Sequence, residues 1–125
     1  MNTHRLAYSA YGRPDTPVKS QRSIEYDLFA RVTKQMIAAS AAKSSDFAGF
    51  VRALHDNTML WRTLASDVAE PENGLPKALR AKLFYLYEFT AQHSSKILDD
   101  QAQIEVLIDI NTAVMRGLRG EGAEV

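Results

Sequence analysis

The chain of 125 residues carries 15 basic and 15 acidic side chains, three histidines and no cysteine, so its formal net charge is zero. A balanced chain has no net positive field that would collect nucleic acid or an anionic membrane surface. The missing cysteines exclude a disulfide framework and thiolate metal sites. Together with the lack of a signal-peptide pattern and of any long apolar run, they favour a soluble cytoplasmic protein that does not enter a membrane.

The length fits one domain, which we divide into three segments. These are an N-terminal arm, a helical bundle and a disordered tail, over residues 1–19, 20–120 and 121–125. Gly12, Pro14 and Pro17 break any helix in the first segment. We therefore expect a flexible arm that becomes ordered only where Tyr8 and Tyr11 meet a surface.

The first helix is expected to begin at Ser20 or Ser23, because either serine is able to cap it. Apolar residues then recur at three- and four-residue spacing, which predicts one buried face. That face consists of Leu28, Val32, Met36 and Ala39. The weak segment AAKSSD, residues 41–46, joins this helix to the next.

A second helix is expected to follow Asp46, whose carboxylate is a suitable cap. Its apolar positions fall within one arc at 100° per residue and predict a core face. They are Phe47, Phe50, Val51, Leu54, Thr58, Trp61, Ala65 and Val68. Pro71 ends the helix, Asn73–Gly74 tolerates a left-handed turn, and Pro76 suits the first position of the next helix. The pattern predicts an antiparallel hairpin with a turn of about four to six residues.

Two more helices complete the pattern. The third runs from Pro76 to about Leu98 and is expected to bury Leu79, Leu83, Leu86, Thr90 and Ile97. A turn at Asp99–Asp100 leads to the fourth, which begins at about Gln101 and ends in a glycine-rich stretch. Its apolar face consists of Ile104, Leu107, Ile108, Asn111, Met115 and Leu118. Short connections between four helices predict an all-α, antiparallel bundle.

The residues that catalysis or metal binding requires are sparse. The chain has no glycine-rich phosphate loop, and its three histidines are widely separated. We therefore expect no catalytic residue, cofactor or metal site. A basic and aromatic cluster favours RNA only weakly, because Glu70, Glu72 and Glu88 are close in sequence. The cluster comprises Lys77, Arg80, Lys82, Phe84, Tyr85 and Tyr87.

The third helix is apolar on more sides than one core contact uses. Tyr85 and Phe89 project opposite the core face, on a stripe shared with Ala78, Lys82 and Lys96. Two interpretations stay open: the N-terminal arm covers this stripe, or the stripe forms a groove for a partner helix. On the second interpretation the candidate partner-binding residues are Lys82, Tyr85, Phe89 and Lys96.

Two asparagines lie among apolar residues. Asn111 is on the apolar face of the fourth helix, and Asn57 is at the edge of that of the second. Buried amides need partners, and a buried asparagine fixes helix register at a cost in stability. On this basis Asn111→Leu is expected to stabilise the fold or to change its association state. Trp61 is expected to be a core anchor whose indole N–H finds an acceptor.

Four stretches of the sequence carry a family resemblance. They are RSIEYDLFARVT, NTMLW, DVAEPENGLPKALRAKL and LIDINTAVMRGLRG, over residues 22–33, 57–61, 67–83 and 107–120. In this order and spacing they resemble the FlaF family of flagellar biosynthesis regulators. The motif matches are Asn57, Leu60, Trp61, Pro76, Arg80, Asn111 and Gly117.

The resemblance implies a small cytoplasmic helical protein that promotes flagellin synthesis or secretion. Flagellin is the partner it implies, and the flagellin-translation repressor FlbT is a second. Binding to flagellin as a chaperone-type module fits the balanced charge better than direct binding to flagellin mRNA. The alternative is a post-transcriptional regulator that acts on that mRNA directly or through FlbT. The oligomeric state is left open.

Overall fold

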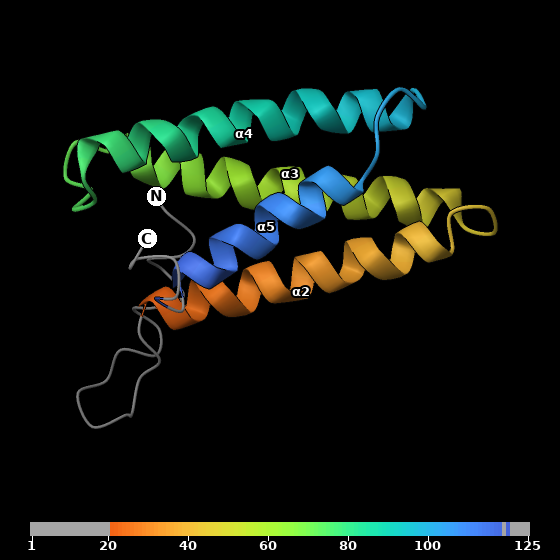
Figure 1. The fold of residues 1–125 in the computed structure, drawn as a ribbon, viewed down its shortest axis with the longest axis horizontal. Coiled ribbons are helices and arrows are strands. Elements are labelled where there is room, and N and C mark those ends of the chain that lie inside the picture. The colour runs from red at the N-terminus through yellow and green to blue at the C-terminus, as the bar shows by residue number, and fades with distance from the viewer. Residues whose placement is uncertain (1–20, 119, 121–125) are drawn as a thin grey trace.

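The computed structural model describes residues 21–118 and 120. Within these residues the chain forms four helices and no strand, which confirms the all-α prediction. They are α2 (Gln21–Ala41), α3 (Phe47–Ala69), α4 (Lys77–Leu98) and α5 (Glu105–Leu118). The predicted arm and tail, 1–19 and 121–125, lie outside the described residues. Each helix runs in the opposite direction to the one before it (Figure 1), which is compatible with the expected antiparallel bundle.

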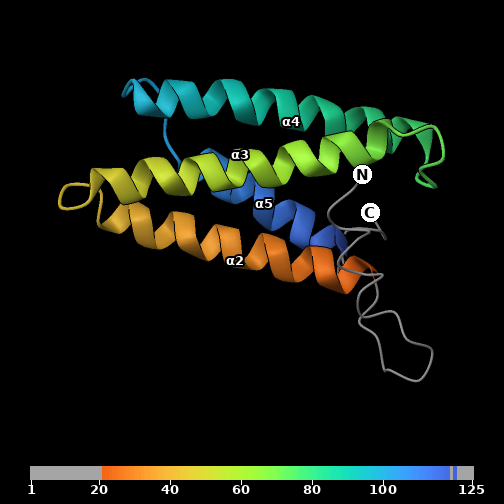
Figure 2. The ribbon, with the colours of Figure 1, turned by 180° about the vertical axis from the view of Figure 1, so that it is seen from behind.

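The four helices do not surround one central axis. α3 packs on both α2 and α4, while α5 packs mainly on α2. Figure 1 shows α5 beginning near the end of α4 and crossing toward the start of α2, and Figure 2 shows the same divergence from behind. The second half of α4 therefore lies close to α5, whereas its first half has α3 as its main neighbour.

The core lies where α2, α3 and α5 meet and continues to the end of α4. Its buried side chains include Met36, Phe50, Leu54, Ile97 and Leu107. The buried face predicted for α2 is too narrow, because this helix packs against both α3 and α5 rather than against one neighbour. Phe29 and Thr33 are also buried, while Leu28 and Ala39 are only partly buried.

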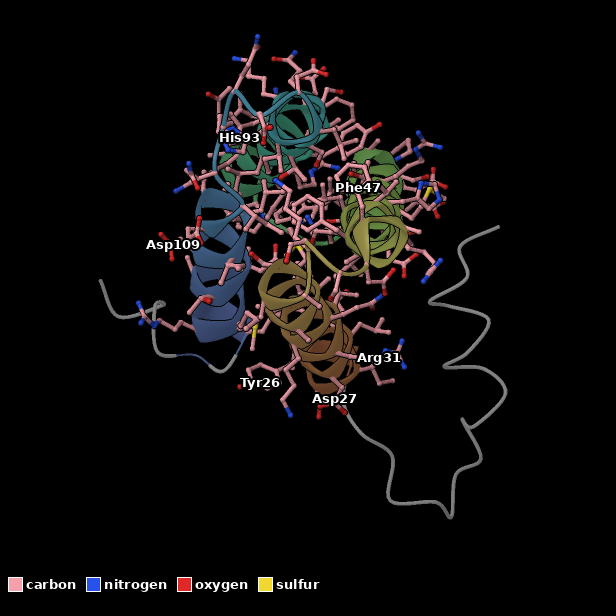
Figure 3. All side chains as sticks on the ribbon, turned by 90° about the vertical axis from the view of Figure 1, so that its right-hand side faces the viewer. Tyr26, Asp27, Arg31, Phe47, His93 and Asp109 are labelled. Carbon is pink, nitrogen blue, oxygen red and sulfur yellow. The ribbon has the colours of Figure 1, made fainter. Side chains whose placement is uncertain are left out.

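Three residues assigned to the core face are instead exposed. Phe47 and Val51 occupy the first turns of α3, and the side chain of Phe47 is 51% exposed. Figure 3 looks onto this end of the bundle and labels Phe47 there, where its ring stacks on that of the core residue Phe50 at 6.0 Å. Leu79, in the first turn of α4, is also exposed, because α5 has diverged from α4 at that point.

The start of α3 has the predicted cap. The Asp46 carboxylate accepts a hydrogen bond of 2.9 Å from the backbone N–H of Gly49. Such a bond satisfies one of the amide groups that a helix leaves unpaired in its first turn.

We expect Asp46→Ala to lower the free energy of unfolding by about 1 kcal/mol, because an amide in the first turn of α3 loses its acceptor. For a chain of this size the melting temperature would fall by about 4 °C. Asp46→Asn, which keeps an oxygen acceptor, is the control. Thermal denaturation followed by circular dichroism measures both, and equal losses in the two variants would contradict the capping role.

The connection between α3 and α4 differs from its predicted form. It spans 70–76, which is longer than expected, and α3 ends at Ala69, two residues before Pro71. No left-handed residue is found between the two helices. The side chain of Asn73 closes the turn instead: its amide donates to the Asp67 carbonyl, and its oxygen accepts from the N–H of Leu75. Pro76 is the residue just before α4 rather than its first helical residue.

The connection between α4 and α5 is also longer than predicted. Asp99 ends α4, and Asp100 adopts a left-handed conformation with φ of 61°. The N–H of Gln101 then bonds the carbonyl of Lys96 at 2.8 Å, which is the pattern of a Schellman helix end. This closure holds the chain out of helical geometry, so that α5 begins at Glu105 rather than near Gln101.

Candidate functional site

A hydrogen-bonded cluster of buried polar side chains joins three helices at the centre of the bundle. Asn111 of α5 accepts a hydrogen bond of 2.9 Å from the indole N–H of Trp61 in α3. Its amide nitrogen donates to Asn57 Oδ1 at 2.8 Å and to Thr33 Oγ1 at 3.1 Å. All four side chains are buried, and Phe29 packs edge-on against the indole at 5.5 Å. The predicted acceptor for Trp61 and the predicted partners for Asn111 are thus confirmed.

These contacts reverse the expected effect of a leucine at position 111. Asn57 is fully buried rather than at the edge of a face, and its Nδ2 atom has no partner within the described part of the chain. Loss of the Asn111 amide would leave the side chain of Asn57 without a hydrogen bond and would remove the acceptor of the Trp61 indole N–H. An unpaired buried polar group costs about 1–3 kcal/mol. The substitution is therefore expected to destabilise the fold.

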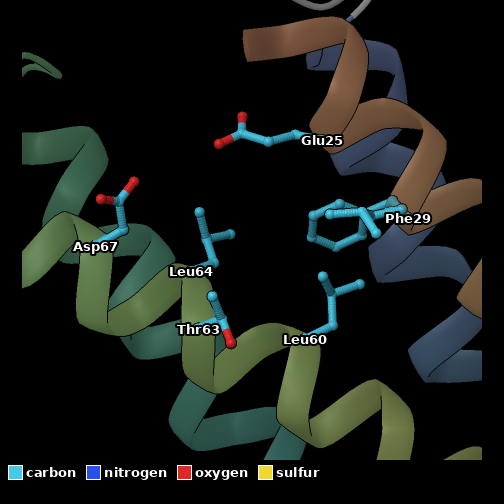
Figure 4. Close-up of a pocket in the computed structure, with 7 residues that line it drawn as sticks. Glu25, Phe29, Leu60, Thr63, Leu64 and Asp67 are labelled. Carbon is cyan, nitrogen blue, oxygen red and sulfur yellow. The ribbon is translucent and has the colours of Figure 1, made fainter. Parts of the chain in front are cut away.

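A small crevice lies between the start of α2 and the end of α3 (Figure 4). Leu60 and Leu64 of α3 face Phe29 of α2, with the carboxylates of Glu25 and Asp67 on the side away from Leu60. Its volume is about 30 Å³. Pockets that hold cofactors measure about 300–1,000 Å³, so this crevice is far too small for one. Leu60, a matched motif residue, is thereby placed at the α2–α3 contact.

His55 and His93, the histidines in the described part of the chain, do not form a metal site. Within residues 21–118 and 120, no three His, Asp or Glu side chains lie close enough together to hold a metal ion. His93 Nε2 lies 3.1 Å from the backbone carbonyl of Gln103, and the ring stacks on Phe89 at 5.1 Å. His93 thus ties α4 to the segment that leads into α5.

The first half of α4 presents an apolar surface. All three buried residues of this helix, Thr90, Ser94 and Ile97, lie in its second half. None of the large apolar or aromatic side chains before Thr90 is buried, and Tyr85 is 62% exposed. We refer to these residues as the α4 surface. They are Leu79, Leu83, Phe84, Tyr85, Leu86, Tyr87 and Phe89.

The four candidate partner-binding residues lie along one side of α4, because the helix is continuous through all of them. Lys82 and Lys96 are exposed, as is Tyr85. Phe89 is half-buried because of its contact with His93. The competing interpretation, in which the arm covers this side, involves Tyr8 and Tyr11, which lie outside the described residues.

A second hollow lies where α3 ends and α4 begins. It has a volume of about 250 Å³, and we call it the basic hollow. Its lining consists of Val68, Ala69, Lys77, Arg80, Ala81 and Phe84. Arg80 Nη1 donates to the Glu70 carbonyl at 3.1 Å, so this motif residue also braces the turn between the helices. Lys82, the third cation of the sequence cluster, does not line the hollow.

The remaining motif residues have local structural positions. Pro76 precedes α4 and provides no side-chain cap. Gly117 lies within the last turn of α5 rather than ending that helix. A Cβ atom at Gly117 would meet nothing within 4 Å, so close packing does not require glycine there. Thr33 could not be identified from sequence, because no pattern distinguishes a threonine beside the apolar face from one on a solvated face.

The fold and its surfaces define a small all-helical protein with an exposed aromatic helix surface. The sequence pattern of the family described as flagellar protein FlaF matches residues 7–118. Because this match spans most of the chain, the chain belongs to the FlaF family of flagellar proteins, which confirms the resemblance. No curated protein and no solved structure matches it. None of the described helices is long and apolar enough to cross a membrane.

Proposed function

We propose that this FlaF-family protein binds flagellin in the cytoplasm as a chaperone-type helical module, and thereby promotes flagellin synthesis or secretion. Membership of a flagellar protein family supports the process. The observation that supports the mode of action is the α4 surface, none of whose aromatic and leucine side chains is buried. Amphipathic helices bind such surfaces through a few apolar anchors and need no cofactor.

The position of α4 supports the same proposal. The first half of α4 packs mainly on α3, so its other sides are open to a partner helix placed beside it. Exposed apolar surface of this kind is costly in a soluble protein and marks interaction sites. Flagellin subunits assemble by packing their own helices, so a surface that shields a helix suits a partner of unassembled flagellin.

We expect the double variant Tyr85→Ala/Phe89→Ala to bind monomeric flagellin at least about thirty-fold more weakly than the unmodified protein. Two aromatic anchors each contribute more than about 1 kcal/mol at typical interfaces. Isothermal titration calorimetry with purified monomeric flagellin measures the affinities. Circular dichroism checks that helicity is retained, since Phe89 also stacks on His93.

Phe47→Ala is the matched control, because Phe47 is an exposed aromatic residue at the opposite end of the bundle. This variant is expected to bind flagellin normally. Equal affinity of the double variant and the unmodified protein would leave flagellin as the partner but move the site away from α4. Failure of the unmodified protein to bind flagellin would reject the chaperone proposal.

The second candidate is a regulator that acts on flagellin mRNA directly or through FlbT. The observation that favours direct binding to mRNA is that two cations, Lys77 and Arg80, lie together in the basic hollow. Direct contacts to phosphate predict an RNA affinity that falls steeply with added salt. The indirect route through FlbT would be favoured by two results together. The protein would bind FlbT, and its affinity for flagellin mRNA would be absent or independent of salt.

A further inference from the structure

We propose that the basic hollow recognises an acidic side chain of the flagellin segment that binds α4, at a point where this carboxylate lies next to an apolar anchor. The inference rests on the proposed function and specifies the chemistry of the partner. The hollow brings two cations, Lys77 and Arg80, against four apolar residues at one end of the α4 surface. Phe84 belongs to both the hollow and the α4 surface, so the two adjoin at this residue.

Arg80 supplies the most specific part of the hollow. One Nη1 hydrogen bond to the Glu70 carbonyl holds the guanidinium in place against the turn. Its Nε atom is buried and has no acceptor among the described residues. A guanidinium offers five N–H donors in a fixed planar arrangement that matches a carboxylate. A bound acidic side chain would therefore supply acceptors that the chain itself does not.

The surroundings favour a peptide carboxylate over the phosphates of a nucleic acid. A nucleic-acid backbone is held by a row of cations along its length. Here Lys77 and Arg80 are accompanied by Glu70 and Glu72 in the turn, and the chain has no net charge. Val68, Ala69, Ala81 and Phe84 contribute apolar atoms beside the two cations, which suits a carboxylate next to an apolar side chain.

Salt-dependent binding kinetics test the proposal. We expect Lys77→Glu to lower the association rate with monomeric flagellin by about ten-fold at low salt, because complementary charge steers association. The difference should shrink to less than about two-fold near 1 M salt, where charges are screened within about 3 Å. Lys34→Glu, an equal charge reversal at an exposed position of α2, is the control and should change the rate by less than about two-fold at any salt.

The outcomes separate this proposal from the function on which it rests. Flagellin binding with identical rates for Lys77→Glu and the unmodified protein would overturn the acidic contact and leave the proposed function standing. No flagellin binding by the unmodified protein would overturn both. Loss of RNA binding in Lys77→Glu with flagellin binding intact would make the hollow a phosphate site, contrary to the proposal.

A crosslinking experiment identifies the bound segment. The chain has no cysteine, so Ala81→Cys introduces one thiol, at an exposed position that lines the hollow. A photoreactive maleimide on this thiol, irradiated with bound flagellin, allows the contacted peptide to be found by mass spectrometry. We expect that peptide to carry Asp or Glu within one helical turn of a large apolar residue. A crosslinked peptide without an acidic residue would contradict the proposal.

Discussion

Trp61→Ala is expected to lower the free energy of unfolding by about 4 kcal/mol, because removal of a fully buried tryptophan leaves a large cavity. The substitution also removes the edge-on contact with Phe29 and the hydrogen bond to Asn111. A loss of this size is a large share of the roughly 5–15 kcal/mol that stabilises a typical domain. The melting temperature should fall by about 15 °C.

Urea denaturation followed by circular dichroism measures this effect, because the variant lacks the only tryptophan of the chain. Met59→Ala, a truncation of an exposed side chain in the same helix, is the control and should cost less than about 1 kcal/mol. A loss of less than about 2 kcal/mol for Trp61→Ala would show that the neighbouring helices collapse into the space, contrary to a rigid centre.

Asn111→Leu is expected to cost about 3 kcal/mol of unfolding free energy, the sum of two stranded polar groups in the interior. These are the indole N–H of Trp61 and the side-chain amide of Asn57. Urea denaturation followed by the fluorescence of Trp61 measures the loss. Ala113→Leu places leucine at an exposed position of α5 and should change stability by less than about 0.5 kcal/mol. Equal or greater stability of Asn111→Leu would support the original expectation from sequence.

A double-mutant cycle isolates the hydrogen bond between Trp61 and Asn111. Trp61→Phe keeps most of the ring but removes the indole N–H, which leaves Asn111 Oδ1 without its donor. The second substitution of the cycle is Asn111→Leu. If the bond contributes to stability, the combined variant Trp61→Phe/Asn111→Leu should lose about 1 kcal/mol less unfolding free energy than the sum of the losses in the two single variants. Additive losses would show that the bond makes no net contribution.

Much of the fold could be predicted because the periodicity of apolar residues is strong in α3 and α5 and because the turns between helices carry clear stop signals. The N-cap at Asp46 and the helix end before Pro71 follow from local chemistry, and the structure has both. The errors concern contacts between helices. One helical projection gives one face, so it does not show that α2 contacts two neighbours or that α5 diverges from α4. For these reasons Phe29 was left out of the predicted buried face of α2, and Leu79 was wrongly expected to be buried.

The candidate site was less predictable than the fold. The sequence indicated that Trp61 and Asn111 each need a partner, but residues 50 positions apart are not paired by any periodic pattern. The exposed stripe around Tyr85 could be found because it lies on one helix. The basic hollow could not, since its lining depends on how the end of α3 meets the start of α4 across a turn.

Because burial is unequal along α4, residues needed for folding and residues open to binding lie in different halves of one helix. Residues that hold the bundle together lie after Phe89, while those before it contribute little to the interior. Exposed substitutions usually change stability by less than about 0.5 kcal/mol. Exposed positions in the first half of α4, such as Tyr85, are therefore able to change without loss of the interior, so that binding preference and stability are set by different parts of one helix.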